Sequence, residues 1–203
     1  MNLWTNNKCE DWQAALDRYT DTIELQHVNG LEELDTWYRC ELPKLIAERS
    51  PAYITRDELE RVTRWKMKRG VWRERNRLLV QSNPIELVKK TAREAFAAIP
   101  DPRKPVDILS QLAGVGPATA SGVLACVAPE LYPFFDELVA TQIPDLGKVT
   151  FSLTYYQRYA EQLRQRANRL QERKTCADQK WTAHQVSQAL WSQSGGKAKH
   201  TLK

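Results

Sequence analysis

The most constraining feature of this chain is a tight turn, residues 114–117, set between two short apolar segments at 108–112 and 118–125. The turn contains Gly114, Gly116 and Pro117. Glycine permits a positive φ and lets another backbone approach closely, and proline suits the first turn of a helix. The spacing therefore predicts a helix, a turn and a second helix within residues 106–128, with their apolar faces packed together.

A turn of this kind leaves amide N–H groups unpaired at the positive end of the second helix, where a phosphate can bind. The residues expected to contact a nucleic-acid backbone are Gly114, Val115, Gly116, Ala118 and Thr119. Phosphate contacts position a protein on a nucleic acid but read no sequence, so the turn does not separate DNA from RNA. The alternative is an ordinary helical corner with glycines in its turn.

Residues 109–120 match the pattern L-x-x-L-x-G-V/I-G-x-x-T-A. This segment resembles the helix-hairpin-helix motif of DNA repair proteins, and the chain as a whole resembles the helix-hairpin-helix DNA glycosylase (HhH-GPD) superfamily. The resemblance implies an all-α, two-lobed glycosylase-like fold that contains the helix-hairpin-helix and has no iron–sulfur cluster. It also implies base excision repair of double-stranded, damaged DNA by a hydrolase.

In that superfamily an essential aspartate lies 18 residues beyond the hairpin position that is lysine in the bifunctional members. The corresponding residues here are Ala118 and Asp136. The resemblance implies that Asp136 stabilises positive charge on the sugar and activates water. Ala118 has no amine, so Schiff-base chemistry from this position is excluded and a monofunctional enzyme is expected. Asp136 as a helix N-cap, or Glu137 as the functional carboxylate, are the alternatives.

The chain is also similar, over residues 45–192, to a eukaryotic group that shares W-K-x-x-R-G, G-V-G-P-A-T-A-S and P-F-F-x-D-E segments, a likeness that implies no particular activity. The first segment contains Lys66 and Arg69, which together with Arg73 are expected to contact phosphates or a base. The aromatic candidates for a base-stacking pocket are Trp65, Trp72, Tyr132, Phe134 and Phe135. Aromatic residues at helical spacing also belong to protein cores, which is the alternative for each of them.

The charge of the chain is unevenly distributed. Residues 1–50 contain ten acidic and five basic residues, so the remaining 153 residues carry +10 of a total net charge of +5. Nine bases and four acids lie between Arg56 and Arg77, and six bases and two acids lie between Arg158 and Lys174. Such asymmetry indicates a polyanionic partner, although either segment alone would also suit a solvated helix face.

The organisation expected along the chain consists of four parts. They are acidic helices at 1–50 that pack with the C-terminal lobe, a helical lobe at 51–130, a C-terminal helical lobe at 131–192 and a disordered basic tail at 193–203. Thr55 and Glu58 predict a capping box for a helix ending near Arg69. A long basic surface helix is expected from residue 153 to residue 174, and a last helix begins at Thr182.

The four cysteines are more than 30 residues apart and form no CxxC pair, which argues against zinc or an iron–sulfur cluster. Free thiols suit a reducing compartment, and we expect an intracellular, nuclear rather than cytoplasmic protein. No apolar run reaches a membrane-spanning length, so no membrane partner is expected. No cofactor is expected beyond a monovalent cation that the hairpin can hold.

Three functions remain open from the sequence: a DNA glycosylase that uses Asp136, a non-catalytic nucleic-acid-binding module, and a protein-interaction scaffold that docks through residues 1–50. The oligomeric state and the base removed are not encoded in any recognisable pattern.

Overall fold

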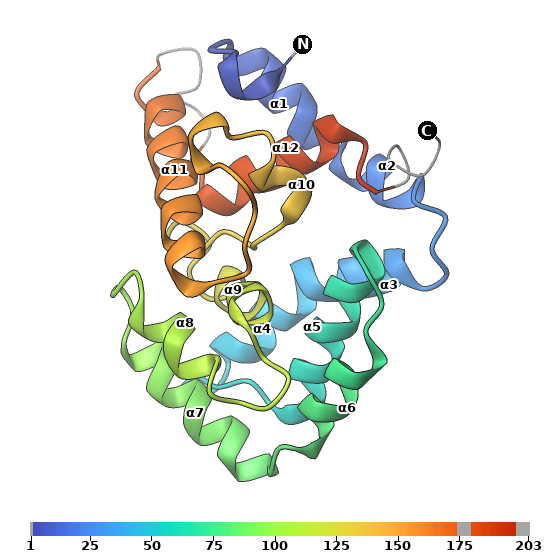
Figure 1. Cartoon of the computed structure of the whole chain (residues 1–203), viewed down its shortest axis with the longest axis vertical. Coiled ribbons are helices and arrows are strands. Elements are labelled where there is room, and N and C mark those ends of the chain that lie inside the picture. The colour runs from blue at the N-terminus through green and yellow to red at the C-terminus, as the bar shows by residue number, and fades with distance from the viewer. Residues whose placement is uncertain (1, 174–179, 198–203) are drawn as a thin grey trace.

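The computed structural model describes residues 2–173 and 180–197, and the regular secondary structure of that part of the chain is entirely helical (Figure 1). The α-helices are α1 (Cys9–Asp17), α2 (Tyr19–Glu24), α3 (Leu31–Thr36), α4 (Leu42–Ala47), α5 (Arg56–Arg69), α6 (Glu74–Ser82), α7 (Ile85–Ala97), α8 (Lys104–Leu109), α9 (Pro117–Ala125), α10 (Glu137–Ala140), α11 (Leu153–Gln171) and α12 (Ala183–Ser194). The other helical turns are η1 (Leu3–Thr5), η2 (Trp37–Glu41) and η3 (Pro144–Leu146). The all-α class predicted from the sequence is confirmed.

Side-chain caps fix where the two best-marked helices begin. Thr55 Oγ1 accepts a hydrogen bond from the Glu58 amide at 3.3 Å, and Glu58 Oε2 accepts one from the Thr55 amide at 2.9 Å. Thr182 and Gln185 form the same reciprocal pair at the start of α12. Each pair satisfies two amides that a helix start leaves open. Both predicted starts are confirmed.

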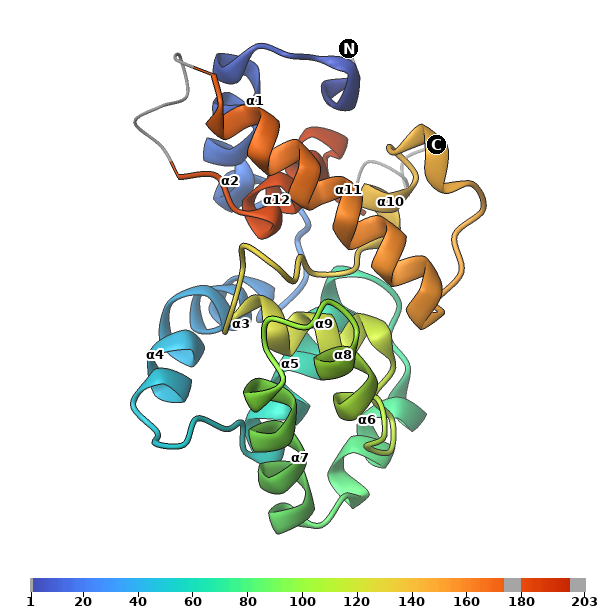
Figure 2. The same ribbon diagram turned by 90° about the vertical axis from the view of Figure 1, so that its left-hand side faces the viewer.

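The helices form two groups with α9 between them (Figures 1 and 2). One group contains α1, α2, α10, α11 and α12, in which α1 packs along α12 and α12 packs on α11 and α10. The other contains α3 to α8, in which α5 packs on α3 and α6, and α7 packs on α8. Helix α9 contacts α5, α8 and α11, and its residues 119–125 are all buried. The core of the molecule is therefore continuous through α9.

The acidic N-terminal region is divided between the two groups. Helices α1 and α2 pack on α12, as expected, but α3 packs on α5 in the other group. The prediction that the helices of residues 1–50 pack with the C-terminal helices therefore holds for α1 and α2 but not for α3. The helical segment from residue 31 to residue 47 is interrupted by the π-helical turn η2, where the Leu42 amide donates a hydrogen bond to the Trp37 carbonyl. Pro43 follows and lacks an amide N–H, so the regular bonding pattern cannot continue through it.

Two predictions about the C-terminal part need correction. Helix α11 ends at Gln171, and it is not merely a surface helix, because eight of its side chains are buried, including Tyr155, Tyr156 and Tyr159. Helix α12 continues to Ser194 and Gly195 caps it with a φ of 76°. The expected disorder from residue 193 is therefore wrong for residues 193–197, and the expectation for 198–203 lies outside the described residues.

The cysteines differ from the sequence expectation. Cys9 is disulfide-bonded, whereas Cys40 and Cys126 are free. The expectation of free thiols throughout is therefore wrong for Cys9. A separate search of the described residues finds no helix that is both long enough and apolar enough to cross a membrane.

The turn between α8 and α9 is held by close contact with α6 and by one buried side chain. Gly114 has a φ of 76°, and a Cβ at this position would lie 2.6 Å from the Asn76 carbonyl oxygen. Asn83 follows α6 and clamps the residue before this glycine: its Nδ2 donates to the Ala113 carbonyl and its Oδ1 accepts from the Ala113 amide, both at 2.9 Å. Gly116 is different, because its φ of −110° suits any residue and a Cβ there would meet nothing within 4 Å. The positive φ that glycine permits is therefore adopted at Gly114 and not at Gly116.

This difference between the two glycines gives a stability prediction. Gly114→Ala places a Cβ against the α6 backbone in a left-handed conformation and should lower the free energy of unfolding by about 1–3 kcal/mol. Gly116→Ala, the matched control, should lower it by less than about 1 kcal/mol, because only a weak preference for glycine over alanine at an N-cap is lost. Chemical denaturation of both variants measures the difference, and equal losses would contradict the described packing of Gly114.

Candidate functional site

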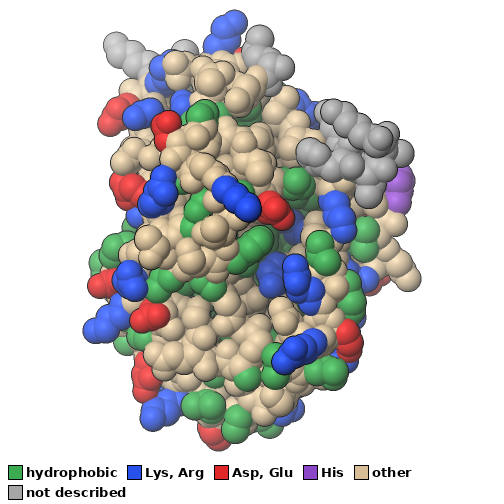
Figure 3. All heavy atoms as spheres, viewed as in Figure 1, with side chains coloured by type: hydrophobic (Ala, Val, Ile, Leu, Met, Phe, Trp, Pro, Cys, Tyr) green, Lys and Arg blue, Asp and Glu red, His purple; other side chains and the backbone are tan. Residues whose placement is uncertain are grey.

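A cavity of about 570 Å³ lies where three segments meet: the end of α5 with the start of α6, the turn before α9, and the chain that enters α10. Its lining combines basic residues, acidic residues and apolar groups. They include Lys66, Met67, Arg69, Val71, Arg73, Gly114, Gly116, Ala118, Thr119, Phe134, Phe135, Asp136, Glu137, Leu138 and Phe151. The molecular surface in Figure 3 shows Lys and Arg side chains gathered beside hydrophobic ones near the middle of this face. The volume is that of a small-molecule site, which typically occupies about 300–1,000 Å³.

The turn contains three amides without a protein acceptor. Among residues 2–173 and 180–197, none accepts a hydrogen bond from the amide of Gly114, Gly116 or Ala118, and all three residues line the cavity. The amides of Val115 and Thr119 are already used, since they donate to the carbonyls of Leu112 and Gly116 at 3.1 and 2.9 Å. Val115 is also absent from the cavity wall. The predicted phosphate-binding set is therefore reduced to Gly114, Gly116 and Ala118 as amide donors.

Asp136 lies at the opposite wall, at the end of an extended segment that is firmly held. Its Oδ1 accepts a hydrogen bond from the Leu138 amide at 2.9 Å, so it is the N-cap of α10. The Phe135 amide donates to Ser121 Oγ at 3.0 Å, and Tyr159 Oη donates to the Phe134 carbonyl at 2.7 Å. Ser121 belongs to α9, so the segment that carries Asp136 is tied to the same helix that carries the turn.

The second oxygen of Asp136 faces Arg69. The Arg69 Nη2 lies 3.2 Å from Asp136 Oδ2, and the side chains are only 3% and 10% exposed. Burial raises the pKa of the Asp136 carboxyl, and the Arg69 charge and the amides of Leu138 and Val139 oppose that rise. The carboxylate is thus fixed in direction by two partners on two different elements.

The Arg69 guanidinium is enclosed by aromatic rings. Its central carbon lies 4.3 Å from the Trp191 ring centroid, 4.8 Å from that of Trp65 and 5.2 Å from that of Phe134. Its Nη1 also donates to Tyr19 Oη at 2.9 Å. Arg69 therefore positions Asp136 from within the core, and it contributes only its edge to the cavity.

Two other basic residues line the cavity more openly. Arg73 is exposed at the start of α6, and Lys66 is half-buried on α5. Burial, together with the nearby charge of Arg73, lowers the pKa of Lys66 to about 8. The sequence correctly brought Lys66, Arg69 and Arg73 together at one site.

The aromatic predictions divide between the cavity and the core. Phe134 and Phe135 line the cavity, as does the acidic candidate Glu137. Trp65 is completely buried, stacks on Tyr38 with ring centroids 3.7 Å apart, and does not line the cavity. Tyr132 is also completely buried, and its hydroxyl donates to the Asp101 carbonyl. The prediction that these two rings belong to the pocket is wrong, because both rings are packed in the core and neither lines the cavity.

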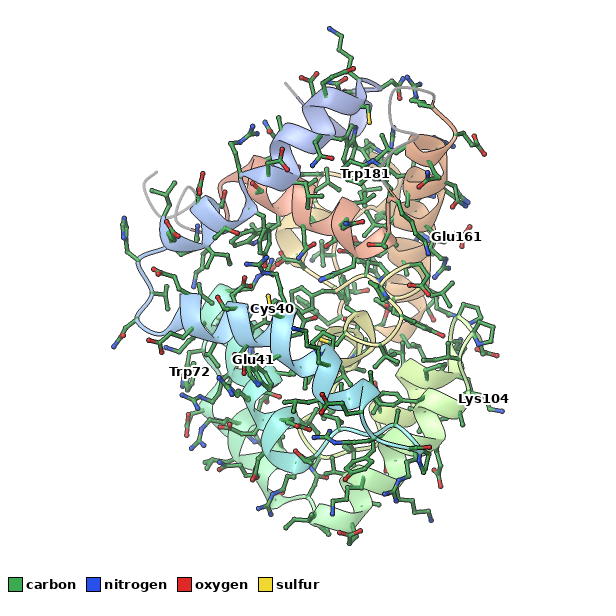
Figure 4. All side chains as sticks on the ribbon, turned by 180° about the vertical axis from the view of Figure 1, so that it is seen from behind. Cys40, Glu41, Trp72, Lys104, Glu161 and Trp181 are labelled. Carbon is green, nitrogen blue, oxygen red and sulfur yellow. The ribbon has the colours of Figure 1, made fainter. Side chains whose placement is uncertain are left out.

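Trp72, the remaining aromatic candidate, lies outside the cavity wall and is 47% exposed. Figure 4 shows it at the outer edge of the molecule, away from the core tryptophan Trp181. Its Nε1 donates to Glu74 at 3.1 Å. A ring in this position is available to a partner at the surface rather than to a small group inside the cavity.

Sequence reasoning missed the residues that hold the site together: Asn83, Ser121, His184 and Phe151. Only Asn83 had a local signal, an asparagine before proline at the end of a helical pattern. His184 is buried, and its Nδ1 accepts a hydrogen bond from the Phe134 amide at 3.4 Å. Burial, with the charge of Arg69 adding to it, lowers the pKa of His184 to about 3. The imidazole is therefore neutral in the folded chain and acts as an acceptor.

The buried neutral histidine makes stability depend on pH. Its pKa is lower in the folded chain than in the unfolded chain, so the unfolded state gains protons first and stability is lost as pH falls below about 6.5. Between pH 7 and pH 5 the wild type should lose about 2 kcal/mol more unfolding free energy than His184→Asn, which keeps a short acceptor but cannot titrate. Denaturation curves at the two pH values measure this, and parallel losses would show that His184 titrates normally.

Searches against protein-family models, curated proteins and solved structures found no significant match to this chain.

Proposed function

We propose that this chain is a DNA-binding protein of helix-hairpin-helix glycosylase type, in which α8, the turn and α9 form the hairpin and the two groups of helices form the two lobes. In this proposal it hydrolyses the N-glycosidic bond of a nucleotide held in the cavity. One observation carries the proposal: the open amides of Gly116 and Ala118 and the carboxyl of Asp136 line the same cavity. A protein that binds the phosphate of a nucleotide and cleaves the N-glycosidic bond of that nucleotide needs these two features within the length of one nucleotide.

The binding half of the proposal is supported by charge and by shape. The space beside Gly116 is unobstructed, because a Cβ at that position would meet nothing within 4 Å. Lys66 and Arg73, which line the cavity more openly than Arg69, belong to the segment of the sequence that is richest in basic residues. A phosphate at the turn would meet the positive end of α9 and this basic surface together. The partner proposed is double-stranded DNA that contains a damaged base, in a nuclear repair role.

The chemical half of the proposal assigns a role to each wall of the cavity. Phe134, Phe135 and Phe151 supply apolar ring surface for an extruded base. As the bond from C1′ to the base nitrogen breaks, positive charge develops on the sugar, and the Asp136 carboxylate stabilises it. Water then adds to C1′ and Asp136 accepts its proton, while the departing base takes up a proton from solvent. The products are a free base and an abasic sugar.

A second candidate is a non-catalytic DNA-binding module, and the ion pair between Arg69 and Asp136 favours it. Each oxygen of Asp136 already has one partner, the Leu138 amide or Arg69. A carboxylate with these two partners is fully explained by its structural roles in capping α10 and neutralising a buried cation. The two candidates share the turn and differ only in what Asp136 does.

Binding is tested at Gly116. Gly116→Leu adds a side chain where the fold leaves open space, so it should leave the fold intact but block a phosphate and weaken DNA binding by about tenfold or more. Wild-type affinity for a short duplex should also fall steeply as salt rises, because phosphate contacts release counterions. Fluorescence anisotropy of a labelled duplex measures both effects, and Gly116→Ala is the matched control. Wild-type affinity in Gly116→Leu would remove the turn from the interface.

Catalysis is tested at Asp136. Asp136→Asn retains a good N-cap but removes the negative charge, so it should abolish base release from a panel of modified-base duplexes while leaving DNA binding in place. The wild-type rate should fall on acidification at a higher pH than for an exposed aspartate, because burial raises the pKa of Asp136.

Glu137→Gln, a change to the neighbouring exposed acid, is the matched control and should retain activity. Base release is measured by alkaline strand scission at the abasic product. If no duplex releases a base above the Asp136→Asn background while the wild type binds DNA, the hydrolase proposal fails and the non-catalytic candidate stands. Loss of activity in Glu137→Gln alone would transfer the catalytic role to Glu137.

A further inference from the structure

Lys66 lines the cavity and enters the proposed function only through its positive charge, with no role in the hydrolysis itself. It projects from α5 into the cavity that also contains Asp136 and the Gly116 turn. Within the part of the chain that the structure describes, its ammonium group has no hydrogen bond and no ion pair. Two lysines on α7 differ in this respect, since each has an acidic partner: Lys89 lies 2.8 Å from Glu86, and Lys90 lies 3.9 Å from Glu94.

The surroundings of Lys66 favour the neutral amine. Its burial opposes the charged form, and the only charge identified as acting on it is that of Arg73, which has the same sign. With a pKa of about 8, roughly a fifth of the side chain is neutral at pH 7.4. A neutral amine is a nucleophile, whereas an ammonium group is only a point charge. Asp136 and Glu137 line the same cavity, but no ion pair joins either of them to Lys66 in the part of the chain that the structure describes.

The proposed hydrolysis produces a group with which such an amine reacts. Removal of the base leaves a hydroxyl on C1′, and this hemiacetal is in equilibrium with an open-chain aldehyde. The aldehyde would form in the cavity that Lys66 lines. No amine is available at the turn itself, because the residue there is Ala118.

We propose that Lys66 is an amine nucleophile that captures the aldehyde of an abasic sugar in this cavity as a Schiff base, a step that rests on the proposed function for its substrate. The Nζ lone pair forms a bond to C1′, and the carbonyl oxygen becomes a hydroxyl. A proton passes from nitrogen to this hydroxyl, which leaves as water. The sum is amine plus aldehyde to imine plus water, so no oxidant or reductant is needed. Ala118 would then exclude Schiff-base chemistry at the turn, but it would not exclude this chemistry at Lys66.

The test uses a duplex with a single abasic site prepared beforehand, so it does not depend on base removal by this protein. Sodium borohydride reduces an imine to a stable amine, and the cross-linked protein is then counted on a denaturing gel and the modified residue is located by mass spectrometry. The wild type should form the cross-link at Lys66. Its rate of formation should rise with pH up to about 8, because the neutral amine is the reacting form.

Lys66→Arg keeps the positive charge but cannot form this imine, and it should reduce the cross-link by about tenfold or more. Lys90→Arg, on the exposed surface of α7, is the matched control and should behave as the wild type. Circular dichroism and duplex affinity show whether each variant is folded and bound. If Lys66→Arg does not fold, the position of the adduct in the wild type still decides the question.

The outcomes separate this inference from the proposed function. A duplex bound without any cross-link, or a cross-link mapped to another lysine, overturns the role of Lys66 and leaves hydrolysis by Asp136 standing; Lys66 is then a phosphate contact. A cross-link at Lys66 in a protein that releases no base supports the inference and contradicts the hydrolase. No binding to an abasic duplex at all overturns both.

Discussion

The buried guanidinium of Arg69 is the constraint on which the rest of the structure depends. A charge that is removed from water must be compensated where it lies, and Arg69 is compensated by Asp136, by the Tyr19 hydroxyl and by the faces of surrounding rings. Arg69 ends α5 in one group of helices, whereas Tyr19 belongs to α2 and Trp191 to α12 in the other group. Removing any one of them would leave part of a buried charge unpaired. The relative position of the two groups is therefore fixed by electrostatics as well as by apolar packing.

The same constraint shapes the chemistry that is open to the cavity. Asp136 cannot rotate freely, because one of its oxygens caps α10 and the other faces Arg69. A preorganised carboxylate is an advantage where positive charge develops nearby, because it needs no reorganisation at the moment of reaction. The nearby cation reduces that advantage by neutralising part of the carboxylate's charge. The same ion pair is thus compatible with a hydrolase and with a non-catalytic binding module. The hydrolase requires that the electric field of Asp136 at the sugar exceed the opposing electric field of Arg69.

The sequence predicted the features that depend on a few neighbouring residues. The capping pair of Thr55 and Glu58 and the turn at Gly114 are such features, because hydrogen bonding and allowed φ values are decided locally. Residues that act across the fold gave no such signal. Ser121 and His184 hold the segment before Asp136 from 14 and 50 residues away, and their partners are backbone amides, which every segment offers.

The burial of individual side chains is the second property that could not be predicted from the sequence. Trp65 and Phe134 are both aromatic and both lie near the cavity, but only Phe134 reaches its wall. Trp65 is instead fixed by the Tyr38 ring on its face and by a hydrogen bond from its Nε1 to Asp35 at 2.9 Å. Which of two rings faces a ligand is decided by such tertiary partners, and neither periodicity nor composition contains them.

Helix α9 explains why a turn and a carboxyl from different parts of the chain can act at a fixed separation. Its small residues allow close neighbours: Gly122 lies against Val62 and Phe134, and its carbonyl accepts a hydrogen bond from Tyr38 at 2.7 Å. The helix cannot shift without disturbing the core around it. Since Ser121 on this helix also holds the segment that carries Asp136, the turn at the start of α9 and the carboxyl are fixed relative to each other. A nucleotide bound at the turn would therefore meet Asp136 in a geometry set by the core and not by surface loops.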